Sequence, residues 1–92
     1  MKVRNMQSER SGRDIANQFI ITDGDKEYFQ SYTTTIAVIE NGQVTLDEDK
    51  WEHSTTTGKY RNIFLGEKVA ETRKKIASGE YKLSKLNLQG WE

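Results

Sequence analysis

The side chains that could carry acid–base or nucleophilic chemistry are few in this chain of 92 residues. There is no cysteine, and His53 is the only histidine. Ser54 follows His53 directly and carboxylates are plentiful, so composition alone does not exclude a Ser–His–Asp arrangement. Adjacent side chains point in different directions, however, and Ser54 is well placed to cap a helix. We therefore predict no catalytic residues and a protein that is not an enzyme.

Two short motifs resemble ligand-binding loops but lack essential parts. Asp23-x-Asp25-x-Glu27 weakly resembles a calcium loop, without the later glycine and the bidentate glutamate. Gly58-Lys59 is the pair found in phosphate loops, but His53 stands where that motif needs its first glycine, and Tyr60 stands where it needs Ser or Thr. The sequence therefore predicts no metal site and no cofactor.

Charge is distributed unevenly, although the formal net charge is zero. Residues 23–52 contain two positive and eight negative side chains, net −6, and residues 59–85 contain eight positive and three negative ones, net +5. Solvated faces explain such runs in most small domains. The alternative is a dipolar molecule in which each patch selects a partner. The acidic residues proposed to bind a basic groove on a partner protein are Asp23, Asp25, Glu27, Asp47, Glu48 and Asp49.

Nucleic-acid binding is the alternative function, because phosphate contacts need clustered cations. The candidates in the second half of the chain are Lys59, Arg61, Arg73, Lys74, Lys75 and Lys82. A pI near 6.6 is low for a dedicated binder, and the acidic half would repel a polyanion unless it points away.

A small-ligand patch is a third candidate site. It would consist of Gln30, Tyr32, Trp51, Thr56 and Lys59. The structural alternative is that Ser54 caps the helix, Thr56 bonds within its first turn, and Trp51 staples the helix entry.

Length and patterning place these residues on one small domain spanning residues 1–92. Only 34% of the residues are hydrophobic, but they are patterned rather than scattered, which argues against disorder. Residues 2–6 alternate weakly and predict an edge strand, and Ser8–Asp14 reads as a loop. Residues 1–14 are therefore expected to form an edge strand followed by a flexible loop.

Two hairpins are predicted between residues 17 and 47. Strands 17–22 and 27–32 would be joined by a four-residue loop, which pairs Ile21 with Tyr28 and Ile20 with Phe29. Strands 36–40 and 43–47 flank Asn41-Gly42, the typical type I′ turn. The Thr33-Thr34-Thr35 run is either continuous strand or a bulge.

Two helices follow, at residues 55–65 and 67–78, each ending at a glycine. Residues 81–88 form either a short final strand or an extended tail on the sheet. The predicted fold is thus α+β: an antiparallel meander of four to five strands, followed by two helices packed on one face. The expected core residues are Phe19, Ile21, Tyr28, Ala37, Ile39, Val44 and Leu46 against Tyr60, Ile63, Phe64, Val69 and Ile76.

No apolar run approaches the length of a membrane helix, and Met1-Lys2 is not followed by the apolar stretch of a secretory signal. The absence of cysteine fits a reducing compartment. The sequence predicts a cytoplasmic protein with no membrane partner, and it leaves the oligomeric state open.

A longer pattern of aromatic and Ser/Thr residues runs through residues 15–85. Its parts are Asn17-Gln18-Phe19-Ile20-Ile21, Tyr28-Phe29-Gln30-Ser31-Tyr32, Val44-x-Leu46-Asp47, Trp51-x-x-Ser54-x-Thr56-Thr57-x-Lys59-Tyr60 and Phe64-Leu65-Gly66. This pattern resembles a family of short, uncharacterised proteins encoded by phages and prophages of Gram-positive bacteria. The family has no established activity, so the resemblance implies no catalytic residues.

The resemblance implies a phage accessory protein acting in the cytoplasm of the bacterial host. The expected function is non-enzymatic binding of a host protein, such as inhibition of a defence nuclease or another nucleic-acid-processing factor. A nucleic-acid-binding accessory role for the basic second half is the alternative.

Overall fold

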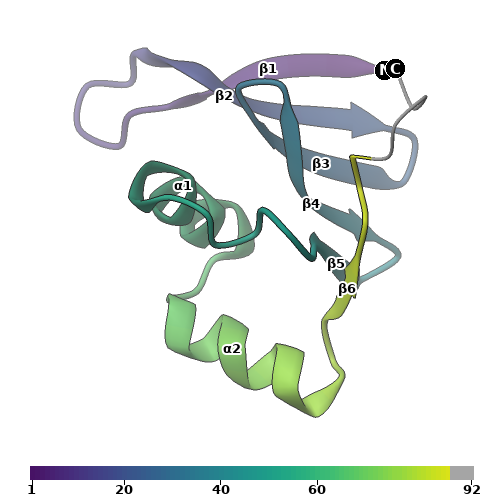
Figure 1. Cartoon of the computed structure of the whole chain (residues 1–92). Helices are drawn as coiled ribbons and strands as arrows, with labels where there is room; N and C mark the ends of the chain where they lie inside the picture. The colour runs from purple at the N-terminus through teal and green to yellow at the C-terminus, as the bar shows by residue number, and fades with distance from the viewer. Residues whose placement is uncertain (88–92) are drawn as a thin grey trace.

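The fold is built on a sheet of six strands that lie in chain order. The computed structural model describes residues 1–87, and its strands are β1 (Lys2–Gln7), β2 (Asp14–Asp23), β3 (Lys26–Ser31), β4 (Thr34–Glu40), β5 (Gln43–Asp47) and β6 (Lys82–Ser84). The first five form an antiparallel meander, and β6 pairs with β5 in parallel. The helices α1 (Thr55–Leu65) and α2 (Val69–Ser78) lie on one side of this sheet (Figure 1). The predicted α+β architecture is therefore confirmed, and of the final segment only Leu88 lies outside the described residues.

The hairpin between β4 and β5 has the predicted turn and register. Asn41 and Gly42 both have positive φ, 52° and 80°, as a type I′ turn requires. Ile39 lies opposite Val44 and Ala37 opposite Leu46. These four side chains contribute to the core beneath the helices.

The hairpin between β2 and β3 has the predicted register but a shorter loop. Ile21 lies opposite Tyr28 and Ile20 opposite Phe29, as expected. Asp23 also pairs with Lys26, so only two residues remain in the loop.

The predicted core face of this first hairpin is wrong. Phe29 lies opposite Ala37, and directly opposed side chains share one face of a sheet. Because Ala37 faces the helices, Phe29 and its partner Ile20 face them too, and both are buried. Phe19, Ile21 and Tyr28 alternate with these residues and therefore point to the opposite side of the sheet.

The ends of the two helices are defined by capping residues, and neither helix has a strongly amphipathic face. Ser54 accepts a hydrogen bond from Thr57 N, and Gly66 ends α1 in the left-handed conformation. Lys68 precedes α2 without a side-chain cap, and Gly79 ends this helix in the same left-handed way. α2 thus begins two residues later than predicted.

The helices contribute a smaller part of the core than expected. Tyr60, Phe64, Leu65 and Ile76 pack against the buried residues of the sheet. Ile63 is 41% exposed, so its predicted place in the core is wrong. Val69 is half-buried and lines a surface hollow rather than the core cluster. Tyr81, just before β6, and Met6 of β1 complete the core.

Candidate functional site

The face of the sheet opposite the helices carries an apolar row that crosses four strands. Val3 lies opposite Ile21, Ile21 opposite Tyr28, and Tyr28 opposite Val38. Val3 is 61% exposed, whereas the other three are half-buried. Leu86 and Lys85 cross one end of the row and, with Tyr28 and Val38, line a hollow of about 240 Å³. A contiguous apolar surface with polar neighbours is typical of an interaction site.

The strand at the edge of this row has a free side. β1 pairs with β2 alone, and no other strand among residues 1–87 lies beyond it. Alternate residues of such a strand direct their N–H and C=O groups away from the sheet, ready to pair with another chain. Lys2 and Arg4 point to the helix side of the strand, since they lie opposite Thr22 and Ile20, and Val3 points to the open side.

Sequence reasoning did not single out these three residues. The alternation of charged and apolar residues at positions 2–4 is visible in the sequence. It does not by itself tell a partner-binding edge strand from an ordinary one, because that depends on which strands lie beside it.

The acidic residues predicted to form one patch lie at the two ends of the sheet. Asp23 and Asp25 are exposed at the β2–β3 loop, beside Glu40 at the end of β4. Glu48 and Asp49 are exposed just after the end of β5. Strand β5 begins beside Glu40 and is about 13 Å long, so it separates these two residues from Glu40. Glu27 is half-buried on the helix side of β3.

Asp47, the sixth acidic residue, is buried and has a structural role. Its carboxylate accepts hydrogen bonds from the backbone N–H groups of Asp49 at 3.2 Å, Lys50 at 2.9 Å and Leu86 at 2.8 Å. These bonds fix the turn that leaves β5 and tie it to the chain after β6. The six acidic residues therefore do not form a single surface.

The six basic residues are likewise divided. Arg61 is 2% exposed, and Lys75 is bonded to Glu67. Arg73 is paired with Glu52. Only Lys59, Lys74 and Lys82 are exposed with no carboxylate partner among the described residues, and they lie on three different elements.

The residues of the predicted small-ligand patch do not converge. Gln30 lies opposite Phe19 and lines a hollow on the open side of the sheet, whereas Thr56 and Lys59 are exposed on α1. Trp51 packs against the core and lies beneath the guanidinium of Arg61, 5.1 Å from the ring centroid. Tyr32 is 59% exposed in the β3–β4 turn with a φ of 57°, an unusual conformation for an aromatic residue.

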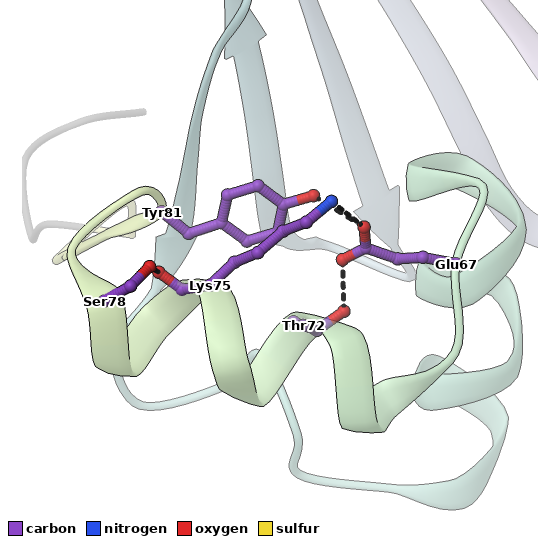
Figure 2. Close-up of polar contacts among 5 residues, drawn as sticks. All are labelled: Glu67, Thr72, Lys75, Ser78 and Tyr81. Atoms are coloured by element: carbon purple, nitrogen blue, oxygen red, sulfur yellow. Dashed lines mark hydrogen bonds and ion pairs between the residues drawn. The ribbon is translucent and has the colours of Figure 1, made fainter.

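A polar cluster joins α2 to the start of β6 (Figure 2). Glu67 accepts hydrogen bonds from Lys75 Nζ at 2.7 Å, Thr72 Oγ1 at 2.7 Å and the Tyr81 hydroxyl at 2.9 Å. Burial alone would raise the pKa of Glu67, but the hydrogen bonds from Lys75, Thr72 and Tyr81 outweigh it, so the pKa is lowered. The bond to Glu67 raises the pKa of Lys75. Burial, followed by the bond to Glu67, raises the pKa of Tyr81.

This cluster predicts a loss of stability in acid. Because the folded-state pKa of Glu67 lies below its unfolded value, its contribution is present above about pH 4.3 and is lost as the pH falls through the folded pKa. Glu67→Gln should cost about 1.5–3 kcal/mol of unfolding free energy at pH 7 and much less at pH 3. Urea unfolding at both pH values measures this. Glu71→Gln, exposed on α2, is the control, and an equal loss at both pH values would contradict the role of the Glu67 charge.

Beside the β5–α1 loop lies a polar hollow of about 680 Å³. It is bordered by the first turn of α1 and by α2, and its charged wall consists of Glu52, Lys59, Arg61 and Arg73. Arg61 donates to Trp51 O at 2.7 Å and to Asn62 Oδ1 at 2.9 Å. Its burial lowers its pKa, an effect that the charge of Glu67 partly offsets.

The fold is that of a small α+β domain in which a six-stranded sheet is covered by helices on one side. The chain belongs to a family of unknown function, DUF8033, which matches residues 1–80. No curated protein and no solved structure matches the chain. The family description gives neither activity nor origin, so the phage context stays a prediction.

Two structural features are absent from residues 1–87. No helix in this part of the chain is long and apolar enough to cross a membrane. No group of three or more His, Asp or Glu side chains there is arranged to hold a metal ion.

Proposed function

We propose that the chain is a non-enzymatic module that binds a partner protein by adding an extended segment of that partner to the edge of β1. The observation that supports this most is the free edge of β1, whose exposed Val3 begins the apolar row on the open face. In strand addition, backbone hydrogen bonds provide affinity, and alternate side chains provide specificity.

The side chains of β1 specify the chemistry of the partner segment. Lys2 and Arg4 lie on one face of the strand and Val3 on the other. A segment that alternates acidic and apolar residues would place carboxylates beside Lys2 and Arg4, and an apolar side chain beside Val3. That apolar side chain would extend the row through Ile21 and Tyr28, where its burial is worth about 1.5–3 kcal/mol.

A second copy of this chain is a poorer partner for the same edge. Antiparallel pairing of two β1 strands about Val3 would place Lys2 of each copy opposite Arg4 of the other. Like charges directly opposite one another destabilise a sheet. The two cations therefore disfavour self-association while favouring an acidic segment.

The resemblance to phage-encoded proteins supplies the biological context for this proposal. In this context, the partner is a host protein in the bacterial cytoplasm. Binding blocks the action of this partner, which is a defence or nucleic-acid-processing factor. Strand addition suits such a role because the backbone contacts tolerate sequence variation in the partner.

The proposal is tested with two synthetic peptides, one of alternating glutamate and valine and one of alternating lysine and valine. The acidic peptide should slow amide hydrogen exchange in β1 and shift the amide resonances of residues 2–5, more strongly at low salt. The double substitution Lys2→Glu, Arg4→Glu should reverse the preference in favour of the basic peptide.

Lys82→Glu on β6, at the other edge of the sheet, is the matched control and should retain the preference for the acidic peptide. Equal binding of both peptides, or shifts confined to other elements, would contradict the proposal. Binding of a single-stranded DNA oligonucleotide at 50 mM salt that weakens steeply with added salt would favour the nucleic-acid alternative instead.

A further inference from the structure

The polar hollow beside α1 has an excess of positive charge on its wall. Lys59, Arg61 and Arg73 line it against the single carboxylate of Glu52. Thr55 also lines it, in the first turn of α1, where a helix supplies no backbone acceptors for the N–H groups. That turn contains no acidic residue to neutralise the helix dipole.

Arg61 is the unusual member of this wall. It is buried, and no carboxylate lies within 4.0 Å of its guanidinium among residues 1–87. Its two bonded nitrogens donate to neutral oxygens, and its Nε is buried without an acceptor. Buried charges are ordinarily paired, because an isolated one is costly. The charge of Glu67 acts on Arg61 only from beyond contact distance, so an anion in the hollow would supply the direct contact that Glu67 does not make.

Gly58 lies beside the buried guanidinium at the hollow. A Cβ at this position would lie 3.6 Å from Nη2 and 3.8 Å from Nη1 of Arg61, in ordinary van der Waals contact. Alanine would therefore fit without a clash and would also suit a helix better than glycine. Packing therefore does not require the glycine at this point, and its missing side chain leaves space beside the Arg61 guanidinium that a Cβ would fill.

We infer that this hollow binds the phosphate group of a small phosphorylated ligand. Three cations and one carboxylate leave a local charge of about +2, which matches a phosphate dianion better than a carboxylate. Phosphate oxygens also suit helix N-termini and guanidinium groups. The volume of about 680 Å³ exceeds what a phosphate alone needs, and Ser54, Asn62 and His53 offer polar partners for the rest of the ligand.

Glu52 is expected to compete with the ligand. Its carboxylate pairs with Arg73, so a bound phosphate must share or take over that cation. Removing the charge of Glu52 should therefore strengthen phosphate binding, although it removes an ion pair from the protein.

The test uses the ¹⁵N-labelled full chain titrated with inorganic phosphate at constant ionic strength. We expect saturable shifts of the Thr55 and Gly58 amides and of the Trp51 indole. Acetate should bind roughly tenfold more weakly or worse. Ribose 5-phosphate should bind more tightly than inorganic phosphate, whereas ribose should produce no shifts. Tighter binding of inorganic phosphate than of ribose 5-phosphate would overturn the inference that the ligand is larger than phosphate itself.

Four variants separate this site from a purely structural role of Arg61. Gly58→Ala and Arg73→Gln should each weaken phosphate binding roughly fivefold or more, while Glu52→Gln strengthens it. Gly58→Ala should melt at or above the temperature of the parent, which shows that the loss is not unfolding. Lys74→Gln, beside Arg73 on α2 but outside the hollow, should leave binding within about twofold.

The inference is overturned if phosphate produces no saturable shifts. It is also overturned if Gly58→Ala and Arg73→Gln bind phosphate as the parent does, or if Lys74→Gln weakens binding as much as Arg73→Gln. None of these measurements involves the β1 edge, so their failure leaves the strand-addition proposal untouched.

Discussion

Replacing Phe29 by alanine is expected to lower the free energy of unfolding by about 3–5 kcal/mol, a large part of the stability of a domain of this size. Phe29 is 0% exposed, lies between Ile20 and Ala37 in the sheet, and meets Phe64 of α1 with 5.8 Å between ring centroids. Its removal would open a cavity between the sheet and the helices that neighbouring side chains fill only in part. Urea unfolding followed by circular dichroism measures the change.

Tyr28→Ala is the matched control, since it removes the adjacent aromatic ring from the open side of the same strand. Tyr28 is half-buried, so its replacement should cost about 1–2 kcal/mol. A greater loss for Tyr28→Ala than for Phe29→Ala would show that the two faces of β3 are assigned the wrong way round.

Replacing Asp47 by alanine is expected to cost about 3–5 kcal/mol, through lost polar contacts rather than lost packing. Three backbone N–H groups, those of Asp49, Lys50 and Leu86, would lose their acceptor. The loss should appear as faster amide exchange at all three donors as well as in urea unfolding.

Asp49→Ala serves as the control for Asp47, because it removes a neighbouring carboxylate that is exposed in the same loop. It should change the unfolding free energy by about 0.5 kcal/mol or less. An effect of Asp47→Ala no larger than this would contradict its role as an acceptor for the turn. Asp47→Asn keeps one carbonyl oxygen and should fall between the two.

Local signals in the sequence predicted the parts of the fold that depend on neighbouring residues. Asn41-Gly42 specifies its turn through two positive φ values, and Gly66 and Gly79 end the helices for the same conformational reason. Ser54 is recognisable as a cap because its hydroxyl needs to reach only Thr57.

The orientation of the first hairpin could not be obtained from such signals. Ile20, Ile21, Tyr28 and Phe29 are all apolar, so alternation within each strand fits either face. The pairing of Phe29 with Ala37 on β4 decides which face of the hairpin is buried. This pairing depends on a register shift between Phe29 and Gln30. A sheet with apolar residues on both faces leaves this choice to tertiary contacts.

The candidate sites were harder to predict than the fold, because net charge along the chain does not specify position in space. Asp47 belongs to the acidic run by composition, yet its carboxylate contacts Leu86, 39 residues further along the chain. Arg61 belongs to the basic run, yet its burial depends on Trp51 and Asn62. Only the folded arrangement shows which charges are free to meet a partner.

The parallel pairing of β5 with β6 has a consequence for the order of folding. Each turn of the meander joins strands that are adjacent in the chain, whereas Thr45 pairs with Lys82 across both intervening helices. Loop closure over such a separation is slow compared with the closing of a hairpin. The meander and α1 should therefore constitute the folding nucleus, and β6 should be the first strand to detach when the native state opens transiently.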